Sequence, residues 1–440
     1  MHFQSGGFDL GIYDQTVWQY AHFLFPYNTI KERFILGDHL TLTLPLLAPL
    51  FWIWEDVKIL LIFQSVFITL SSIAIYKISR IRKFSPFVSL CVSFIYSIFW
   101  GIQFAVYFDF HPIVIGVGLL AWMLYFFEAQ KWKLFWIVLV LTLLTQENMG
   151  IGLACIGIIY FFKKEHRKTA IYFILGGLLV GFLSVKIVSL LSPTGYQYWP
   201  TFDLNPFHLI SKFFDSSDKR LVWLYSFSWF SFLPLISPAT ILSVSLDLSQ
   251  YFLPQKQFGH MVTPFLHERA ILAPIIILGI FDVLAFLKKC KINIFIITLL
   301  LIISTLFQQY IFHFPLNKLS KPNYWKSYKW MKDNERLFTK IPKGVSVATT
   351  QNLIPHLSHR KEIYLLYPRI RDKKNCKNCW WLDFAGKPTY MVIDLHPNQW
   401  ITQLLESNEN FRSAVENMEK AKKITKIQSI NNAFLYKINY

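Results

Sequence analysis

Long apolar runs separated by short polar turns fill the first three quarters of the chain. A run of about 17 to 25 apolar residues can cross a bilayer as a helix. The pattern predicts helices at 57–79, 86–107, 112–128, 133–147, 149–162, 169–191, 269–287 and 292–314, with a pair near 220–250 that prolines interrupt. The helices at 133–147 and 149–162 are shorter than a full span, so we expect broken or re-entrant segments there. The pattern therefore predicts an α-helical polytopic membrane protein with about ten membrane helices, occupying residues 57–315.

The residues before the first long run follow a different pattern. Segment 8–25 mixes apolar and polar residues with helical spacing, which is typical of an amphipathic helix lying in the membrane interface. Segment 40–54 is too short and too rich in proline to span, and Trp52 and Trp54 suit headgroup depth. We therefore expect residues 1–56 to form an outer first loop with interfacial helices.

The character of the chain changes again after the last long run. Residues 316–440 are charged, and they alternate strand-like runs at 345–349, 362–366 and 390–394 with a helix-like run at 410–421. This pattern predicts a small α/β domain. Cys376 and Cys379 form a lone C-x-x-C without a second ligand pair for a metal. A disulfide in an oxidising compartment is the favoured interpretation, and an incidental pair is the alternative.

Composition and charge agree with a membrane protein. The chain is 54% hydrophobic, 18% aromatic and only 16% charged, which excludes an ordinary soluble protein. Its net charge of +18 comes largely from short basic loops near 77–83, 131–133, 163–168 and 288–291, which the positive-inside rule places in the cytoplasm. No nucleic-acid-binding motif is present, so nucleic acid is not an expected partner.

Threading the helices through these loops gives a multi-pass protein of the cytoplasmic (inner) membrane. Both ends of the chain, including the domain at 316–440, are then extracytoplasmic. Met1 would then begin directly outside, so either the first outer loop is translocated unaided or a further membrane helix precedes it, and we favour the preceding helix.

The same threading places several polar clusters on the outer face. They lie at 9–14, 38–39, 109–112, 146–148 and 196–260. Ionisable residues at membrane depth are costly, so their convergence on one face indicates a functional site.

Each acidic cluster also has a structural interpretation. Asp9 and Asp14 are five residues apart and do not share a helix face, so we expect only one of them to point into a site. Asp38 could cap the helix that follows it. Asp109 could cap a helix before a proline, but this does not explain His111, which could bind a metal or transfer a proton together with Asp109.

The other charged residues of the outer face also need partners or allow two interpretations. Glu147 needs a partner, because an unpaired carboxylate would be costly there. Lys186 lies within an apolar run, so it either pairs with Glu147 or binds a lipid phosphate. Arg269 is either a phosphate clamp or a residue that snorkels to the interface.

Six ordered motifs resemble those of DUF2079, a family of predicted membrane proteins of unknown function. They are FDLGIYDQ at 8–15, GDH at 37–39, DFHP at 109–112, QEN at 146–148, GYQY at 195–198 and QNLIPHLSHR at 351–360. That family in turn resembles the C-type (GT-C) integral-membrane glycosyltransferases. In that fold an acidic residue of the first outer loop is the catalytic base, and the matching position here is Asp9.

The resemblance implies a glycosyltransferase that moves a sugar from a polyprenyl-phosphate donor to an acceptor at the extracytoplasmic face. Its expected site comprises Asp9 as catalytic base, a possible divalent metal held by Asp38, His39 and His111, and a substrate-binding set of Asp14, Gln15, Asp109, Gln146, Glu147, Lys186, Tyr196, Tyr198, His260 and Arg269. The alternatives are a flippase of lipid-linked sugars and a non-catalytic scaffold. The inward halves of the helices look apolar, which favours the enzyme over a transporter.

Overall fold

The computed structural model describes residues 3–197, 201, 205–254, 259–367 and 379–440. The chain forms two compact units. The first, called the helical unit, comprises Leu36–Thr43 and Ile62–Tyr324. The second, called the mixed unit, comprises Met1–Ile35, Leu44–Leu61 and Trp325–Tyr440.

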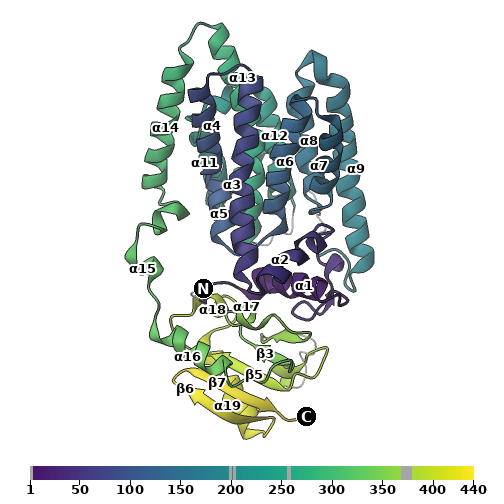
Figure 1. Ribbon diagram of the computed structural model, residues 1–440, viewed down its shortest axis with the longest axis vertical. Helices are drawn as coiled ribbons and strands as arrows, with labels where there is room; N and C mark the ends of the chain where they lie inside the picture. The colour runs from purple at the N-terminus through teal and green to yellow at the C-terminus, as the bar shows by residue number, and fades with distance from the viewer. Residues whose placement is uncertain (1–2, 198–200, 202–204, 255–258, 368–378) are drawn as a thin grey trace. The chain divides into compact units, whose positions relative to one another are not determined.

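The helical unit is built from apolar helices that run alongside one another (Figure 1). Their bounds are α3 Lys58–Ile81, α4 Pro86–Ser97, α5 Trp100–Tyr107, α6 Pro112–Glu128, α7 Trp132–Leu143, α8 Met149–Phe161, α9 Arg167–Leu191, α10 Pro206–Ser211, α11 Ser217–Ser228, α12 Pro238–Phe252, α13 Leu272–Lys289 and α14 Ile294–Ile311. Every membrane helix that the apolar pattern predicts has a counterpart among them. The two proline-interrupted segments near 220–250 are α11 and α12.

Four helices are long and apolar enough to cross a membrane. They are Lys58–Ile81, Lys164–Leu191, Gly259–Lys289 and Ile294–Ile311. Helices α4 and α5 count as a fifth span if the pair, bent by 43°, crosses as one. Helices α6, α7 and α8 are apolar but shorter. The protein is therefore a membrane protein with four or five candidate spans and several shorter apolar helices.

Packing in the helical unit follows the rules for helices in lipid. Helix α13 is buried on nearly every side and forms the centre of the unit. Helices α8 and α9 approach closely at Gly150 and Gly177, where an added Cβ on Gly177 would lie 2.4 Å from the Gly150 carbonyl oxygen. Small residues permit this kind of contact between membrane helices. The outer faces of α9 and α14 expose large apolar side chains such as Leu179 and Phe307, as a lipid-facing surface requires.

The mixed unit contains a five-stranded sheet with strand order β4-β3-β5-β7-β6. The strands are β3 Val347–Thr349, β4 Ile363–Leu365, β5 Tyr390–Asp394, β6 Ile424–Ile430 and β7 Ala433–Ile438. Strand β3 pairs in parallel with β4 and β5, whereas β7 is antiparallel to β5 and β6. Helices α16 (Lys329–Phe338) and α19 (Asn408–Lys420) bury one face each in this unit.

The sequence pattern predicts β3, β4, β5 and α19, and the structure contains all four. The β6–β7 hairpin was missed because its edge strand β6 is largely exposed and lacks a clear apolar run. Its signal was the Asn431-Asn432 turn, in which Asn431 adopts a left-handed φ of 53°.

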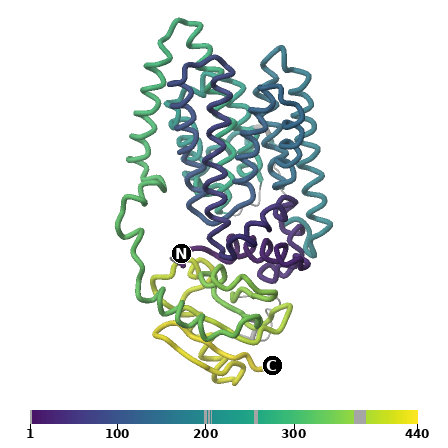
Figure 2. Tube along the Cα trace, viewed as in Figure 1, coloured from purple at the N-terminus to yellow at the C-terminus, as the bar shows by residue number. Residues whose placement is uncertain are grey.

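The N-terminal segment is part of the mixed unit, where Figure 2 shows it in purple. It contains a π-helical turn η1 (Gly7–Gly11), α1 (Ile12–Ala21), the short strands β1 (Tyr27–Asn28) and β2 (Arg33–Phe34), and α2 (Ala48–Ile53). The prediction of an amphipathic helix with an exposed polar face was wrong for α1, because eight of its ten residues are buried, including polar ones. Helix α2 is short, as predicted, and Trp52 and Trp54 near its end are exposed.

Candidate functional site

The six quoted motifs separate into two groups. The motifs at 37–39, 109–112, 146–148 and 195–198 lie in the helical unit, and those at 8–15 and 351–360 lie in the mixed unit. Each group brings together residues that are far apart in sequence. The two groups are described in turn.

Glu147 is the centre of the first group, just before α8. Its Oε1 lies 2.7 Å from Nδ1 of His39 and accepts a hydrogen bond from the Tyr196 hydroxyl at 3.3 Å. Its Oε2 accepts from the backbone N–H of Leu40 at 3.3 Å. Glu147 is buried and His39 is partly exposed. Three polar clusters of the sequence therefore meet at one carboxylate, and its partner is His39 and not Lys186, which was one of two interpretations of that lysine.

Asn148 extends this group toward α12. Its Nδ2 donates to the hydroxyl of Tyr251 at 2.7 Å. The guanidinium of Arg269 lies over the Tyr251 ring, 4.7 Å from its centroid. The Phe252 ring is 5.4 Å from the same guanidinium. Arg269 is thus connected to Glu147 through neighbouring side chains.

Arg269 is completely buried, so it is not a snorkelling residue. Its Nε donates to the carbonyl of Thr263 at 3.3 Å, and its Nη2 donates to the carbonyl of Met261. Its Nη1 is buried without a hydrogen-bond partner among the described residues. A buried donor that lacks a partner is costly. The described residues therefore leave one donor nitrogen of this guanidinium without an acceptor.

His267, two residues before Arg269 in the sequence, forms a ring pair with His111. The rings of His111 and His267 stack with centroids 3.5 Å apart, and His267 Nε2 is 3.2 Å from Glu268 Oε2. Gln64 of α3 holds the preceding loop, because it donates to the carbonyl of Asp109 at 2.9 Å and accepts from the N–H of His111 at 2.7 Å.

The structure does not bear out the alternative interpretation that the two aspartates cap helices. His111, not Asp109, is the N-cap residue of α6, and Asp109 instead adopts a left-handed φ of 54°. Asp38 is buried but caps no helix, since α2 begins ten residues later and Leu47 precedes it. Among the described residues, no three His, Cys, Asp or Glu side chains lie close enough to hold a metal ion. The structure therefore gives no support to a metal at Asp38, His39 and His111.

The remaining predicted residues of the helical unit are dispersed. Gln146 is buried beside Glu147. Lys186 is exposed on α9, with its amine 5.6 Å from the Phe182 ring, and His260 is also exposed. Tyr198 lies outside the described residues, as does Cys376 of the C-x-x-C pair.

A second polar network, which the sequence analysis missed, lies at the basic-loop end of the same helices. Arg82 donates to both Glu128 and Asp282, with Nη1 2.8 Å from Asp282 Oδ1. Lys163 Nζ also lies 2.8 Å from Asp282 Oδ1, and Tyr160 donates to Glu128 at 2.6 Å. The expectation of uniformly apolar inward halves therefore fails at the helix ends.

The two networks mark opposite ends of the helical unit. Helix α6 begins directly after His111 and ends at Glu128, so its 17 residues separate them by about 25 Å. This spacing approaches the ~30 Å hydrocarbon thickness of a bilayer. The arrangement gives two polar layers with an apolar slab between them.

The second group of motifs meets at Asp14 in the mixed unit. Asp14 is fully buried, accepts a hydrogen bond from Ser358 Oγ, and lies 3.1 Å from Nε2 of His359. Burial by itself would lower the pKa of His359, but the Asp14 carboxylate outweighs it and raises that pKa. Gln15 donates to the carbonyl of Lys361 at 3.2 Å. The two sequence ends are thereby joined by buried polar contacts.

Asp9 belongs to the same unit but is placed differently. It lies in the turn η1 and is only partly buried. Gly7 of that turn donates its N–H to the carbonyl of Gln351 at 3.1 Å. An added Cβ on Gly11 would lie 2.5 Å from a side-chain carbon of Ile354, which explains the glycine. Of the two aspartates, Asp14 is therefore the buried one and Asp9 the more accessible one.

Comparisons with known proteins agree with these features at the level of family. No curated protein and no solved structure matches the chain significantly. One family, described as predicted membrane protein, matches residues 1–417. The chain belongs to this family, DUF2079.

Proposed function

We propose that the protein is a glycosyltransferase of the GT-C kind, which moves a sugar from a polyprenyl-phosphate donor to an acceptor at the extracytoplasmic face. The observation that carries the proposal is the buried polar network of the helical unit. It connects an incompletely paired guanidinium, Arg269, through Tyr251 and Asn148 to the carboxylate–imidazole pair of Glu147 and His39. Buried ionisable groups in a membrane protein mark a functional site.

The membrane side of the proposed site is inferred from the charge of the loops between the helices. The basic loops near 77–83, 131–133, 163–168 and 288–291 lie at the Arg82 end of the helices, and the positive-inside rule assigns such loops to the cytoplasm. The network around Glu147 would then face outward. About ten crossing helices, counting the short and bent ones, complete this topology in the inner membrane.

Arg269 is suited to bind the phosphate of the sugar donor. A planar guanidinium binds phosphate oxygens through charge-assisted hydrogen bonds, and its Nη1 would donate to one. The polyprenyl chain would occupy the lipid beside the apolar helices. In the reaction the acceptor oxygen bonds to the anomeric carbon while the bond from that carbon to the phosphate oxygen breaks. The polyprenyl phosphate leaves with the bonding electrons, and Arg269 stabilises its developing charge.

The acceptor proton needs a base. Within the network we assign the base to His39, because the Glu147 carboxylate lies 2.7 Å from its Nδ1, and a carboxylate in this position orients an imidazole for proton transfer. The resemblance to GT-C enzymes instead implies Asp9, in the mixed unit. The two assignments predict different inactive variants.

Membranes containing each variant should be incubated with polyprenyl-phosphate sugar that carries a label on the sugar. His39→Asn keeps a donor near the position of Nδ1 but removes Nε2, so it should reduce transfer about 100-fold or more if His39 is the base. Asp9→Asn should do the same if the resemblance is correct. His313→Asn, at an exposed histidine after α14, is the matched control and should be fully active.

The same experiment separates the enzyme from the flippase. Label that crosses the bilayer still attached to its lipid would identify a transporter. Transfer that survives in both His39→Asn and Asp9→Asn would contradict both base assignments. Absence of both transfer and crossing in the wild type, over a panel of donor sugars, would favour the scaffold.

A further inference from the structure

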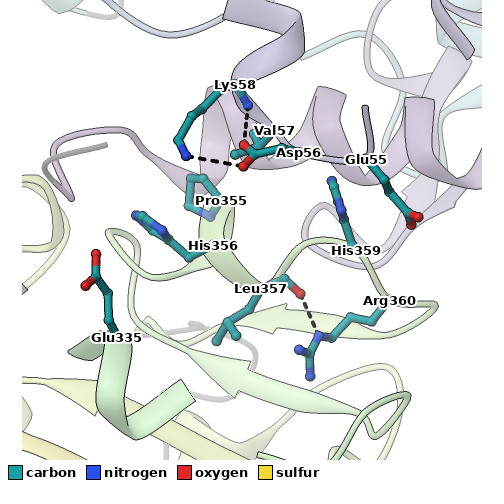
Figure 3. Close-up of a pocket in the computed structure, with 10 residues that line it drawn as sticks. All are labelled: Glu55, Asp56, Val57, Lys58, Glu335, Pro355, His356, Leu357, His359 and Arg360. Atoms are coloured by element: carbon teal, nitrogen blue, oxygen red, sulfur yellow. Dashed lines mark hydrogen bonds and ion pairs between the residues drawn. The ribbon is translucent and has the colours of Figure 1, made fainter. Parts of the chain in front are cut away.

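The mixed unit contains a cavity of about 260 Å³, shown in Figure 3. Its volume is just below the ~300–1,000 Å³ of ordinary small-molecule sites, so it suits a single small ring rather than a lipid chain. Its walls are mainly charged. The charged and titratable lining residues that matter most are Glu55, Lys58, Glu335, His356, His359 and Arg360.

Two basic residues of the cavity, His359 and Arg360, are held in place by contacts other than the cavity's own carboxylates. Arg360 donates through Nε to the carbonyl of Leu357 and through Nη1 to the carbonyl of Val345 at 3.1 Å. His359 is held by Asp14 and faces the rings of Trp18 and Phe51. Their orientation therefore exists before any ligand binds.

His356 supplies an uncharged wall. Its ring stacks on Phe3 with centroids 4.0 Å apart. Burial, assisted by the positive charge of Lys58, lowers the pKa of His356 to about 3. The imidazole is therefore neutral at physiological pH and can both donate and accept a hydrogen bond.

The acidic residues balance the basic ones. Asp56 is paired with Lys58 at 3.2 Å, and Glu55 accepts from Trp18 Nε1 at 2.7 Å. Glu335 projects from the exposed side of α16 toward His356 in Figure 3. Because positive and negative groups line the same small space, an ion of either sign meets both attraction and repulsion there.

We propose that this cavity binds a neutral, polyhydroxylated ring of monosaccharide size. Hydroxyl groups donate to carboxylates such as Glu335 and accept from guanidinium and imidazole groups such as Arg360 and His359, so they use both kinds of wall at once. The ligand is held by preorganised charged partners without carrying a charge itself. The site lies within the mixed unit and does not depend on the transfer reaction proposed above.

The test is saturation-transfer NMR on the full-length protein, purified in a detergent without a sugar headgroup. The probes are methyl glucoside, methyl mannoside, methyl galactoside and N-acetylglucosamine, with inorganic phosphate and lysine as charged competitors. At least one sugar should show transferred signal and a measurable Kd. Neither competitor should displace it at equal concentration.

Glu335→Gln should weaken that sugar about tenfold, because a charge-assisted hydrogen bond becomes a neutral one. Glu55→Gln should weaken it less, since Glu55 already accepts from Trp18. Glu409→Gln, at an exposed glutamate of α19, is the matched control and should leave the Kd unchanged. Equal sugar signals in the wild type and Glu335→Gln, no signal from any sugar, or displacement by phosphate would overturn the proposal.

Discussion

Replacing Asp14 with asparagine should destabilise the mixed unit at pH 5.5 much more than at pH 9. Asparagine keeps an acceptor for Ser358 but removes the negative charge that faces His359. Losing one partner of a buried ion pair costs about 3–5 kcal/mol. The lower end, about 3 kcal/mol, applies here because the His359 side chain is 24% exposed while that of Asp14 is fully buried.

The pH dependence follows from the raised pKa of His359. Burial opposes this rise and Asp14 causes it, so the folded state binds the proton more tightly than the unfolded state. The stabilisation is therefore fully present below the unfolded pKa of about 6.5 and is lost as pH rises through the folded pKa. Above that pH only a neutral hydrogen bond is lost in the variant, which is worth about 1 kcal/mol.

Hydrogen exchange of the backbone amides in α1 and in α17 (Ile354–Leu357) measures the local loss of stability in Asp14→Asn. At pH 5.5 the variant should exchange about 100-fold faster than wild type after correction for intrinsic rates. At pH 9 the ratio should fall below about tenfold. An equal ratio at the two pH values would refute the assigned pairing.

Four further substitutions test other parts of the structure. Gly101→Ala places a Cβ 2.5 Å from the carbonyl oxygen of Arg269, so it should cost about 1–3 kcal/mol in thermal stability and reduce transfer. Gly176→Ala, with open space around the added Cβ on α9, should instead be neutral or stabilising by up to about 1 kcal/mol. Arg82→Met leaves Glu128 and Asp282, at the basic-loop end of the helices, without their shared arginine partner. It should lower the free energy of unfolding by about 3 kcal/mol in a denaturant melt, whereas an unchanged midpoint would exclude a structural role. His356→Phe should make the stability of the mixed unit less sensitive to acid, because the folded-state pKa of His356 of about 3 makes wild-type stability fall as pH drops below about 6.5. Wild type should lose about 3 kcal/mol of stability relative to the variant at pH 4. Parallel pH profiles of unfolding free energy for the two proteins would contradict this.

The helices were predictable because their signals are local. An apolar run ended by a basic loop marks a membrane helix without any knowledge of its neighbours, and Ser85 and Asn293 cap α4 and α14 as local rules expect. The N-terminal helix was misjudged for the opposite reason. Its buried face includes Asp14 and Gln15, which become tolerable only through partners about 345 residues away.

The sequence marks some of the polar residues that meet around Glu147, but it does not indicate how they pair. Glu147 clearly needed a partner, yet nothing in the sequence distinguishes His39 from Lys186 as that partner. Tyr251 gave no signal, because a tyrosine in an apolar helix is common. Gln64, the polar residue that holds the loop before α6, was a usable signal, since an amide within an apolar run needs partners.

The two polar layers support the assignment of the helical unit to a membrane. Each layer ties several helices together by contacts between charged and polar side chains, while the slab between them is held mainly by apolar packing with isolated buried hydrogen bonds, such as that from Ser243 to the carbonyl of Cys155. The layer at the basic-loop end has its charges mutually paired. The layer around Glu147 instead leaves Nη1 of Arg269 without a partner among the described residues. This difference supports the proposal that the layer around Glu147 is the functional one, whereas the paired charges of the other layer suit a structural role.

The central claim is that Arg269 binds the phosphate of a lipid-linked substrate. Native mass spectrometry of the purified protein with added polyprenyl phosphate tests it directly, with polyprenyl alcohol as the uncharged comparison. Wild type and the exposed-arginine control Arg220→Gln should bind one polyprenyl phosphate, while Arg269→Gln should bind it at least tenfold more weakly and bind the alcohol as the others do. Equal phosphate binding by Arg269→Gln and wild type would contradict the claim.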